Sequence, residues 1–173
     1  MKYFTKEWYE SRSIEDGTTA KYQNYLKSLQ PYVSDEFLAS LHLHDAVLQD
    51  CVRAGNDLRL TFHTQHSGTV INEVTLIDAQ IQCDDGIAPG DTWLYEELYL
   101  TEKKYELHVL FDSHSGLKQL IVQAKNVTFG EDETRKRQDE EVRRLLDEYR
   151  SGHEAQRKVA LDKLRKIRKE ELQ

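Results

Sequence analysis

The composition of this chain changes abruptly at Gly130, and the change limits what each side can fold into. Of the 44 residues from Gly130 onward, 25 are charged, none is proline, and Gly152 is the only further glycine. A buried strand cannot carry so many charges, whereas a solvated helix can. The sequence therefore predicts an α+β body at residues 1–129 and, at residues 130–173, a charged helical tail that is not an independent domain.

The first 41 residues of the body are expected to be helical. Residues 2–10 form one predicted helix and residues 18–30 a second, in which apolar side chains recur at spacings of three and four. Pro31 should end the second helix, and Ser34 is placed to cap a short third one.

Residues 42–129 change to the period of two that is typical of strands. The alternation is clearest in residues 58–63 and 105–111. Short turns join successive segments and no helix separates them, which favours an antiparallel, meander-like sheet of about six strands. The apolar positions change parity near Ile77, where a β-bulge at Ile77 or Asp78 would reconcile them.

The two parts of the chain differ in charge. Residues 1–129 contain 11 basic and 19 acidic side chains, and the tail contains 13 basic and 12 acidic. An acidic body repels phosphate backbones, so nucleic acid is not an expected partner. No apolar run approaches the ~20 residues that span a bilayer, and no secretion signal is visible, so we expect no membrane span and a cytoplasmic location. Cys51 and Cys83 are then expected to be reduced thiols.

No motif of a known catalytic or cofactor site is present. The chain lacks a Gly-x-Ser-x-Gly elbow, a Walker loop and a Gly-x-Gly-x-x-Gly loop. The neighbouring carboxylates Glu96 and Glu97 should point to opposite faces of a strand, so they cannot act as an acid–base pair. Whether the protein is an enzyme stays open, with the balance toward a non-enzymatic one, and no cofactor or small-molecule ligand is predicted.

Two closely spaced histidines, His42 and His44, are candidate metal ligands. Side chains at i and i+2 of an extended segment point the same way, and His63, His66 or a carboxylate could complete a ligand set. The alternative is that these histidines lie at a helix-to-strand junction and bond to the backbone.

A second candidate site lies in the segment of residues 92–100. If its leucines are buried, the opposite face carries an outward strip of Trp93, Tyr95, Glu97 and Tyr99. Aromatic side chains offer large rigid contact areas, and a carboxylate can engage a basic partner. The alternative is that aromatic side chains of the N-terminal helices cover this face.

The tail contains two narrow apolar stripes at helical spacing. They consist of Val142, Leu145, Leu146 and Tyr149, followed by Leu161, Leu164 and Ile167. Such stripes are too narrow for a stable lone helix, so the tail should lie on its own body, pair with its own copy, or bind another protein. Ser151 and Gly152 between the stripes permit either one long kinked helix or a helical hairpin.

Three short segments carry a resemblance to a known family. They read Met-Lys-Tyr-Phe-Thr-Lys-Glu-Trp-Tyr at Met1–Tyr9, Leu-His-Asp-Ala at Leu43–Ala46, and Trp-Leu-Tyr-Glu-Glu at Trp93–Glu97. With them the chain resembles an uncharacterised bacterial family, a domain of unknown function whose members begin with nearly the same nine residues. The resemblance implies a bacterial, cytoplasmic protein and no mechanism. The second segment, followed by hairpins, also resembles some toxin-immunity proteins.

Three functional hypotheses follow. The first is a non-enzymatic binding protein, with immunity-type inhibitors as one form, that recognises a protein partner through its acidic body. The second is a metal-binding protein or metal-dependent hydrolase centred on His42 and His44. The third is a structural protein that self-assembles through its tail.

Overall fold

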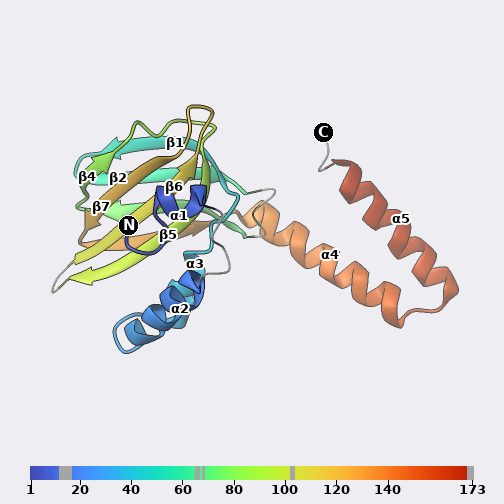
Figure 1. Ribbon diagram of the computed structural model, residues 1–173. Helices are drawn as coiled ribbons and strands as arrows, with labels where there is room; N and C mark the ends of the chain where they lie inside the picture. The colour runs from blue at the N-terminus through green and yellow to red at the C-terminus, as the bar shows by residue number, and fades with distance from the viewer. Residues whose placement is uncertain (12–16, 65–66, 68, 102–103, 171–173) are drawn as a thin grey trace. The chain divides into compact units, whose positions relative to one another are not determined.

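A computed structural model describes residues 1–11, 17–64, 67, 69–101 and 104–170 (Figure 1). The chain divides into two compact units, Met1–Gly130 and Glu131–Gln173. We call the first unit the body and the second unit the tail. The body is an α+β structure built on an antiparallel sheet, as the sequence predicts, and the tail is a pair of helices.

Three helices precede the sheet in the described part of the body. They are α1 (Lys6–Glu10), α2 (Thr18–Leu29) and α3 (Asp35–Ser40). The side chain of Thr5 caps α1 by accepting the Trp8 N–H at 3.1 Å, and Ser34 caps α3 by accepting the Phe37 N–H at 3.2 Å. The predicted cap at Ser34 is thus confirmed, and α2 ends shortly before Pro31.

The sheet contains eight strands, so the expected number of about six was too low. The strands are β1 (Val47–Ala54), β2 (Asp57–His63), β3 (Ile71–Ile77), β4 (Gln80–Asp84), β5 (Thr92–Thr101), β6 (Lys104–Asp112), β7 (Lys118–Ala124) and β8 (Asn126–Glu131).

Two breaks in long extended segments account for the extra strands. β3 and β4 are separated by Asp78 and Ala79, and Asp78 adopts a left-handed φ of 52°. β7 and β8 are separated by Lys125, whose N–H donates to the Ile77 carbonyl at 2.8 Å. The two breaks therefore lie side by side. The structure thus has a break between two strands where the sequence predicted a β-bulge.

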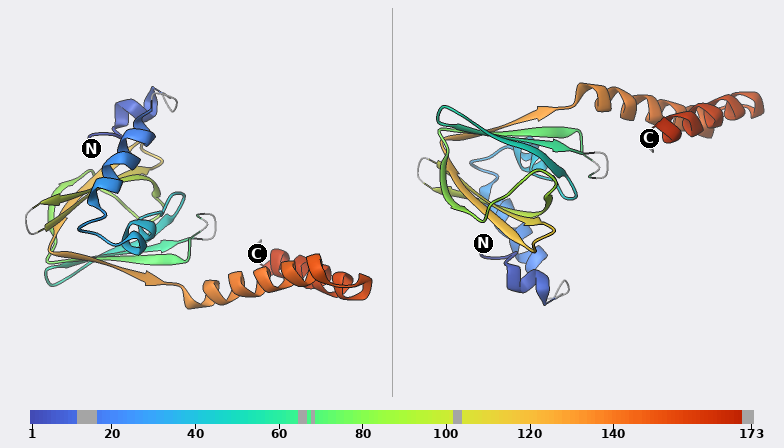
Figure 2. Two further views of the ribbon diagram at one scale, coloured as in Figure 1. Left: turned by 90° about the horizontal axis from the view of Figure 1, so that it is seen from below. Right: turned by 90° about the horizontal axis from the view of Figure 1, so that it is seen from above.

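The strand order is β4-β7-β6-β5-β1-β2-β3-β8. β1 and β5 share the register pair Val47 and Thr92, and backbone hydrogen bonds from Trp93 to Ala46 and from Leu48 to Asp91 extend this junction of two four-stranded halves. Each half contains a meander, β5-β6-β7 or β1-β2-β3. Figure 2 shows that the sheet curls, so that the two halves face each other as two layers.

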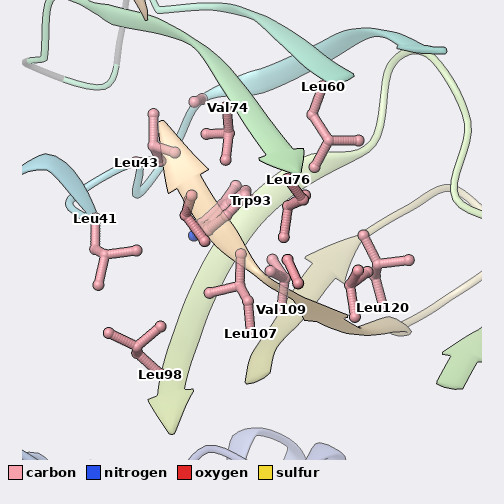
Figure 3. Close-up of a cluster of buried hydrophobic side chains, with 14 of the residues drawn as sticks. Leu41, Leu43, Leu60, Val74, Leu76, Trp93, Leu98, Leu107, Val109 and Leu120 are labelled. Carbon is pink, nitrogen blue, oxygen red and sulfur yellow. The ribbon is translucent and has the colours of Figure 1, made fainter. Parts of the chain in front are cut away.

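The core of the body lies between the two halves of the sheet (Figure 3). Leu60 and Val74 come from one half, Val109 and Leu120 from the other, and all four are almost completely buried. The ring of Trp93 joins the halves and contacts Phe62 and Phe111 at centroid distances of 5.5 and 5.6 Å. Each such side chain contributes about 1.5–3 kcal/mol through burial.

Helix α2 covers the edge of β5 that β1 leaves unpaired. Its buried face consists of Tyr22, Leu26 and Leu29. The Leu98 N–H of β5 donates to the Tyr22 hydroxyl oxygen at 2.9 Å, which supplies the partner that a neighbouring strand would give. Burial of this hydroxyl raises the pKa of Tyr22 far above its usual value.

The tail is a helical hairpin of α4 (Glu133–Ser151) and α5 (Glu154–Glu170), which decides between the two predicted forms (Figure 1). Gly152 lies at the turn, where a Cβ atom would come within 2.5 Å of the Glu148 carbonyl oxygen. The Gly152 carbonyl accepts a hydrogen bond from Arg157 Nε at 2.8 Å. None of the described helices combines the length and the apolar character needed to cross a membrane.

Candidate binding site at strand β5

Three segments that are far apart in the sequence meet at β5. They are Met1–Tyr9, Leu43–Ala46 and Trp93–Glu97. The Phe4 N–H donates to Glu97 Oε1 at 2.6 Å, and the Asp45 N–H donates to the Trp93 carbonyl at 2.9 Å. The segments singled out in the sequence are therefore parts of one structure, which is the candidate site.

A β-bulge in β5 decides which side chains face the site. Trp93 pairs with Phe111, whereas Tyr95 pairs with Leu110, so the register shifts between them. The shift turns Trp93 into the core, where it is fully buried, and leaves Tyr95, Glu97 and Tyr99 on the other face. The four side chains of the predicted strip thus do not share one exposed face, because the prediction assumed uninterrupted alternation.

Glu97 is completely buried and holds the first residues of the chain against β5. Its carboxylate accepts the backbone N–H groups of Lys2, Tyr3 and Phe4 at 2.6, 2.7 and 2.6 Å. The Tyr99 hydroxyl donates a fourth bond to the same carboxylate. Since a buried carboxylate is tolerated only when it is well bonded, Glu97 acts here as the anchor of this N-terminal strap, residues Met1–Phe4.

A polar pair lies beside Glu97 on the same face. His108 Nε2 contacts Glu106 Oε1 at 2.6 Å, and Gln123 donates to Glu106 Oε2 at 2.8 Å. The bonds from Gln123 and then His108 hold the pKa of Glu106 below its usual value. The ring of Tyr99 packs edge-on against His108, whose buried Nδ1 has no hydrogen-bond partner within the described residues.

Glu96 lies on the core side of β5, opposite Val109, while Glu97 pairs with His108 on the other face. The two neighbouring carboxylates therefore point apart, as predicted. Trp93 Nε1 donates to Glu96 Oε2 at 2.8 Å. Burial raises the pKa of Glu96 to about 7, and the bond from Trp93 only partly opposes this rise.

The exposed part of the site surrounds Tyr95. The Tyr95 ring stacks on the Phe4 ring at a centroid distance of 4.9 Å and packs edge-on against the Trp8 ring at 5.3 Å. These two rings hold Tyr95 in place from the side of the N-terminal segment. The rings of His44 and Tyr9 lie 5.3 and 6.3 Å from it. We call Tyr9, His44, Asp45 and Tyr95 the Tyr95 surface.

His44 is held in a fixed orientation on this surface. Its Nδ1 donates to the Leu94 carbonyl, and its Nε2 lies 3.6 Å from Asp45 Oδ1. The side chains of His44 and Asp45 are 53% and 57% exposed. Asp45 has a left-handed φ of 65°, a conformation that aspartate and asparagine tolerate better than most residues. Burial raises the pKa of Tyr95, with smaller contributions from Tyr9 and Asp45.

The candidate metal ligands do not form a cluster. His42 is exposed on the segment before β1, His44 bonds to a backbone carbonyl, and His63 ends β2. His66 lies outside the described residues. Within the part of the chain that the structure describes, no group of three or more histidine, cysteine, aspartate or glutamate side chains is placed to hold a metal ion. The observed bonding of His44 agrees with the backbone alternative.

The predicted tail residues are buried to different extents. Leu145 is completely buried, and Val142, Leu161, Leu164 and Ile167 are partly buried. Leu146 and Tyr149 are 38% and 42% exposed. The hairpin therefore covers the stripe on α5 better than the stripe on α4.

The fold and site define an α+β protein with a curled antiparallel sheet and a strap-covered face. A family described as a protein of unknown function (DUF4085) matches residues 4–122, and the chain belongs to this family. This confirms the resemblance to an uncharacterised family, and the match includes most of the three segments that meet at β5. Comparisons with curated proteins and with solved structures found no match.

Proposed function

We propose that the body is a non-enzymatic binding protein that recognises a basic segment of a protein partner through the Tyr95 surface. The observation that supports this is the exposed carboxylate of Asp45 beside the rings of Tyr9, His44 and Tyr95. Aromatic faces attract cationic side chains, and a carboxylate pairs with them. A lysine or arginine of the partner would meet both kinds of group at one place.

The charge of the body supports the same class of partner. Residues 1–129 contain 19 acidic and 11 basic side chains. A negative field speeds the approach of a basic protein and opposes the approach of nucleic acid.

The packing beneath the surface also supports a binding role. Tyr95 rests on Phe4 and Trp8, and the strap that carries Phe4 is tied to Glu97 by three backbone hydrogen bonds. Rings held in this way lose little conformational entropy when a partner binds. Fixed aromatic side chains are typical of the energetically important positions of interfaces.

An immunity-type inhibitor, which covers a toxic enzyme, is one form of the proposed protein, and a basic enzyme would suit the acidic body. We place the recognition in a bacterial cytoplasm on the basis of the family resemblance. The free thiols of Cys51 and Cys83 are compatible with that compartment.

Affinity capture from cells of the source organism, with four forms of the full chain, tests the proposal. Asp45→Asn removes the charge and keeps a residue type that tolerates the left-handed backbone, and Tyr9→Ala removes a ring. Tyr32→Ala is the control, because Tyr32 is 77% exposed and is not part of the Tyr95 surface. We expect a basic partner that is captured by the parent chain and by the control.

The two site variants should lower the affinity for that partner by about fivefold each, and added salt should weaken capture by the parent chain. Equal capture by all four forms, or an acidic partner, would exclude recognition through the Tyr95 surface.

A further inference from the structure

The α4–α5 hairpin buries little of its apolar surface. Among the described residues of this unit, the buried side chains are Leu145 and Ala160, whereas Leu146 and Tyr149 remain well exposed. Most helical stability in proteins comes from packing an apolar face, and two buried residues provide little of it. The hairpin therefore presents an apolar surface that another element can cover.

The exposed side chains of Leu146 and Tyr149 lie on one side of the hairpin, whereas exposed Val159 lies on the other side of α5. Glu141 of α4 and Lys163 of α5 lie on the opposite side. They are close enough for the charge of Lys163 to contribute to the lowered pKa of Glu141, whose main cause is the hydrogen bond from Arg144. Leu146 is five positions from Glu141, about 140° around α4, and Leu161 is two positions from Lys163, about 160° around α5. Both leucines thus point away from the Glu141 side.

We call the resulting surface the open face. It consists of Val142, Leu146, Tyr149 and Leu161.

Basic residues border the open face on both helices. Arg143 and Arg150 lie three positions before and four positions after Leu146, on the side of α4 that is turned away from Leu145. Lys158 and Arg165 have the same spacing relative to Leu161. All four basic side chains are exposed.

Two of these positive charges have only weak partners. Arg150 lies 3.9 Å from Asp147, and Arg165 lies 3.8 Å from Asp162. The side chains of these pairs are 63–78% exposed, so solvent screens both interactions. The positive borders therefore remain available to a partner.

We propose that the open face binds an amphipathic helix of a partner protein whose apolar stripe is flanked by acidic residues. That helix would lie between α4 and α5 as the third helix of a bundle, with its carboxylates against Arg143, Arg150, Lys158 and Arg165. A second copy of the hairpin is a poor occupant, because its own basic borders would repel these arginines. The Tyr95 surface shares no residue with the open face, so either proposal can fail without the other.

The test uses the full chain and two synthetic helical peptides of about 18 residues, long enough to hold a helix against a surface. Both peptides carry leucines at spacings of three and four, flanked by glutamate in one and by lysine in the other. Binding is measured by fluorescence anisotropy of the labelled peptide. We expect the glutamate peptide to bind at least tenfold more tightly than the lysine peptide.

Three variants locate the binding. Leu146→Asp should weaken binding of the glutamate peptide at least tenfold, and the pair Arg143→Glu with Arg150→Glu should shift the preference toward the lysine peptide. Val159→Asp is the control, because Val159 is 57% exposed and lies two positions from Leu161, on the other side of α5. Circular dichroism of each variant checks that the hairpin remains helical.

Several results would overturn the proposal. Two of them are equal binding of the two peptides and equal loss of binding in the Val159 and Leu146 variants. A third is a dimer of the parent chain in sedimentation that Leu146→Asp abolishes, because a second copy would then be the occupant. Binding to vesicles of phosphatidylserine and phosphatidylcholine without binding to the glutamate peptide would make the face a lipid contact.

Discussion

Phe4 and Glu97 are joined by a hydrogen bond of 2.6 Å from the Phe4 N–H to Glu97 Oε1. The bond crosses 93 positions of sequence and lies in a completely buried environment. It connects the strap to the strand on which Tyr95 lies, so the shape of the Tyr95 surface depends on a carboxylate that the surface does not expose.

Replacing Glu97 with glutamine should destabilise the body by about 3 kcal/mol, because the amide cannot accept all four donors and leaves buried N–H groups unpaired. Urea unfolding measures the change, and amide exchange at Lys2, Tyr3 and Phe4 should accelerate. Glu10→Gln, at an exposed position, is the matched control. A change below about 0.5 kcal/mol would mean that the strap is held by its rings alone.

Glu96 should make stability depend on pH. Its pKa is raised to about 7 in the folded chain, above the ordinary value of 4.5, so the folded chain binds more protons than the unfolded chain between these values. The contribution of Glu96 to the free energy of unfolding is therefore greatest below pH ~4.5. It falls by about 3 kcal/mol in total as the pH rises to ~7. Glu96→Gln should remove this difference, which urea unfolding at a series of pH values would show. Parallel profiles for the two proteins would contradict it.

Tyr22→Phe should cost about 1–2 kcal/mol, because it removes the acceptor of the buried Leu98 N–H. Thermal unfolding measures the loss. Tyr32→Phe provides the comparison. Tyr32 is 77% exposed, so loss of its hydroxyl group should leave the stability of the protein unchanged. Equal effects of the two substitutions would show that the edge of β5 does not depend on Tyr22.

Gly152→Ala should disrupt the turn between α4 and α5, because the added methyl group would lie 2.5 Å from the Glu148 carbonyl oxygen. We expect a loss of about 1–3 kcal/mol and a decrease in helicity confined to the tail, measured by circular dichroism and amide exchange. Ser151→Ala, one position earlier, should leave both unchanged. Unaltered exchange in α4 and α5 of the glycine variant would contradict the expectation.

The parts of the fold that depend on local patterns could be predicted. The helices at residues 18–29 and 35–40, the cap at Ser34 and the strand alternation arise from interactions within a few residues. The helix predicted at residues 2–10 begins only at Lys6, because the backbone N–H groups of residues 2–4 donate to Glu97 instead. The number of strands could not be predicted, because the break at Lys125 has no local signal and is held by a bond to Ile77 in a distant strand.

The candidate site was predicted in part. The segments Met1–Tyr9, Leu43–Ala46 and Trp93–Glu97 were recognised as distinctive, but their convergence was not visible. The exposed residues Tyr9 and Asp45 were not expected in the site, and the left-handed backbone of Asp45 leaves no mark in the sequence. Trp93 and Glu97 were expected at the surface and are buried for different reasons. The bulge turns Trp93 into the core, whereas Glu97 keeps its predicted face and is covered by the N-terminal strap.

The sequence by itself determined the class of fold, the change of character at Gly130 and the charge of each part, since these depend on composition and on short-range periodicity. Only the tertiary structure decided which face each residue of β5 occupies and what covers it. The physical reason is that a bulge and a buried carboxylate are stabilised by partners far away in the chain: Phe111 and Leu110 define the shifted register, and the N-terminal strap satisfies Glu97.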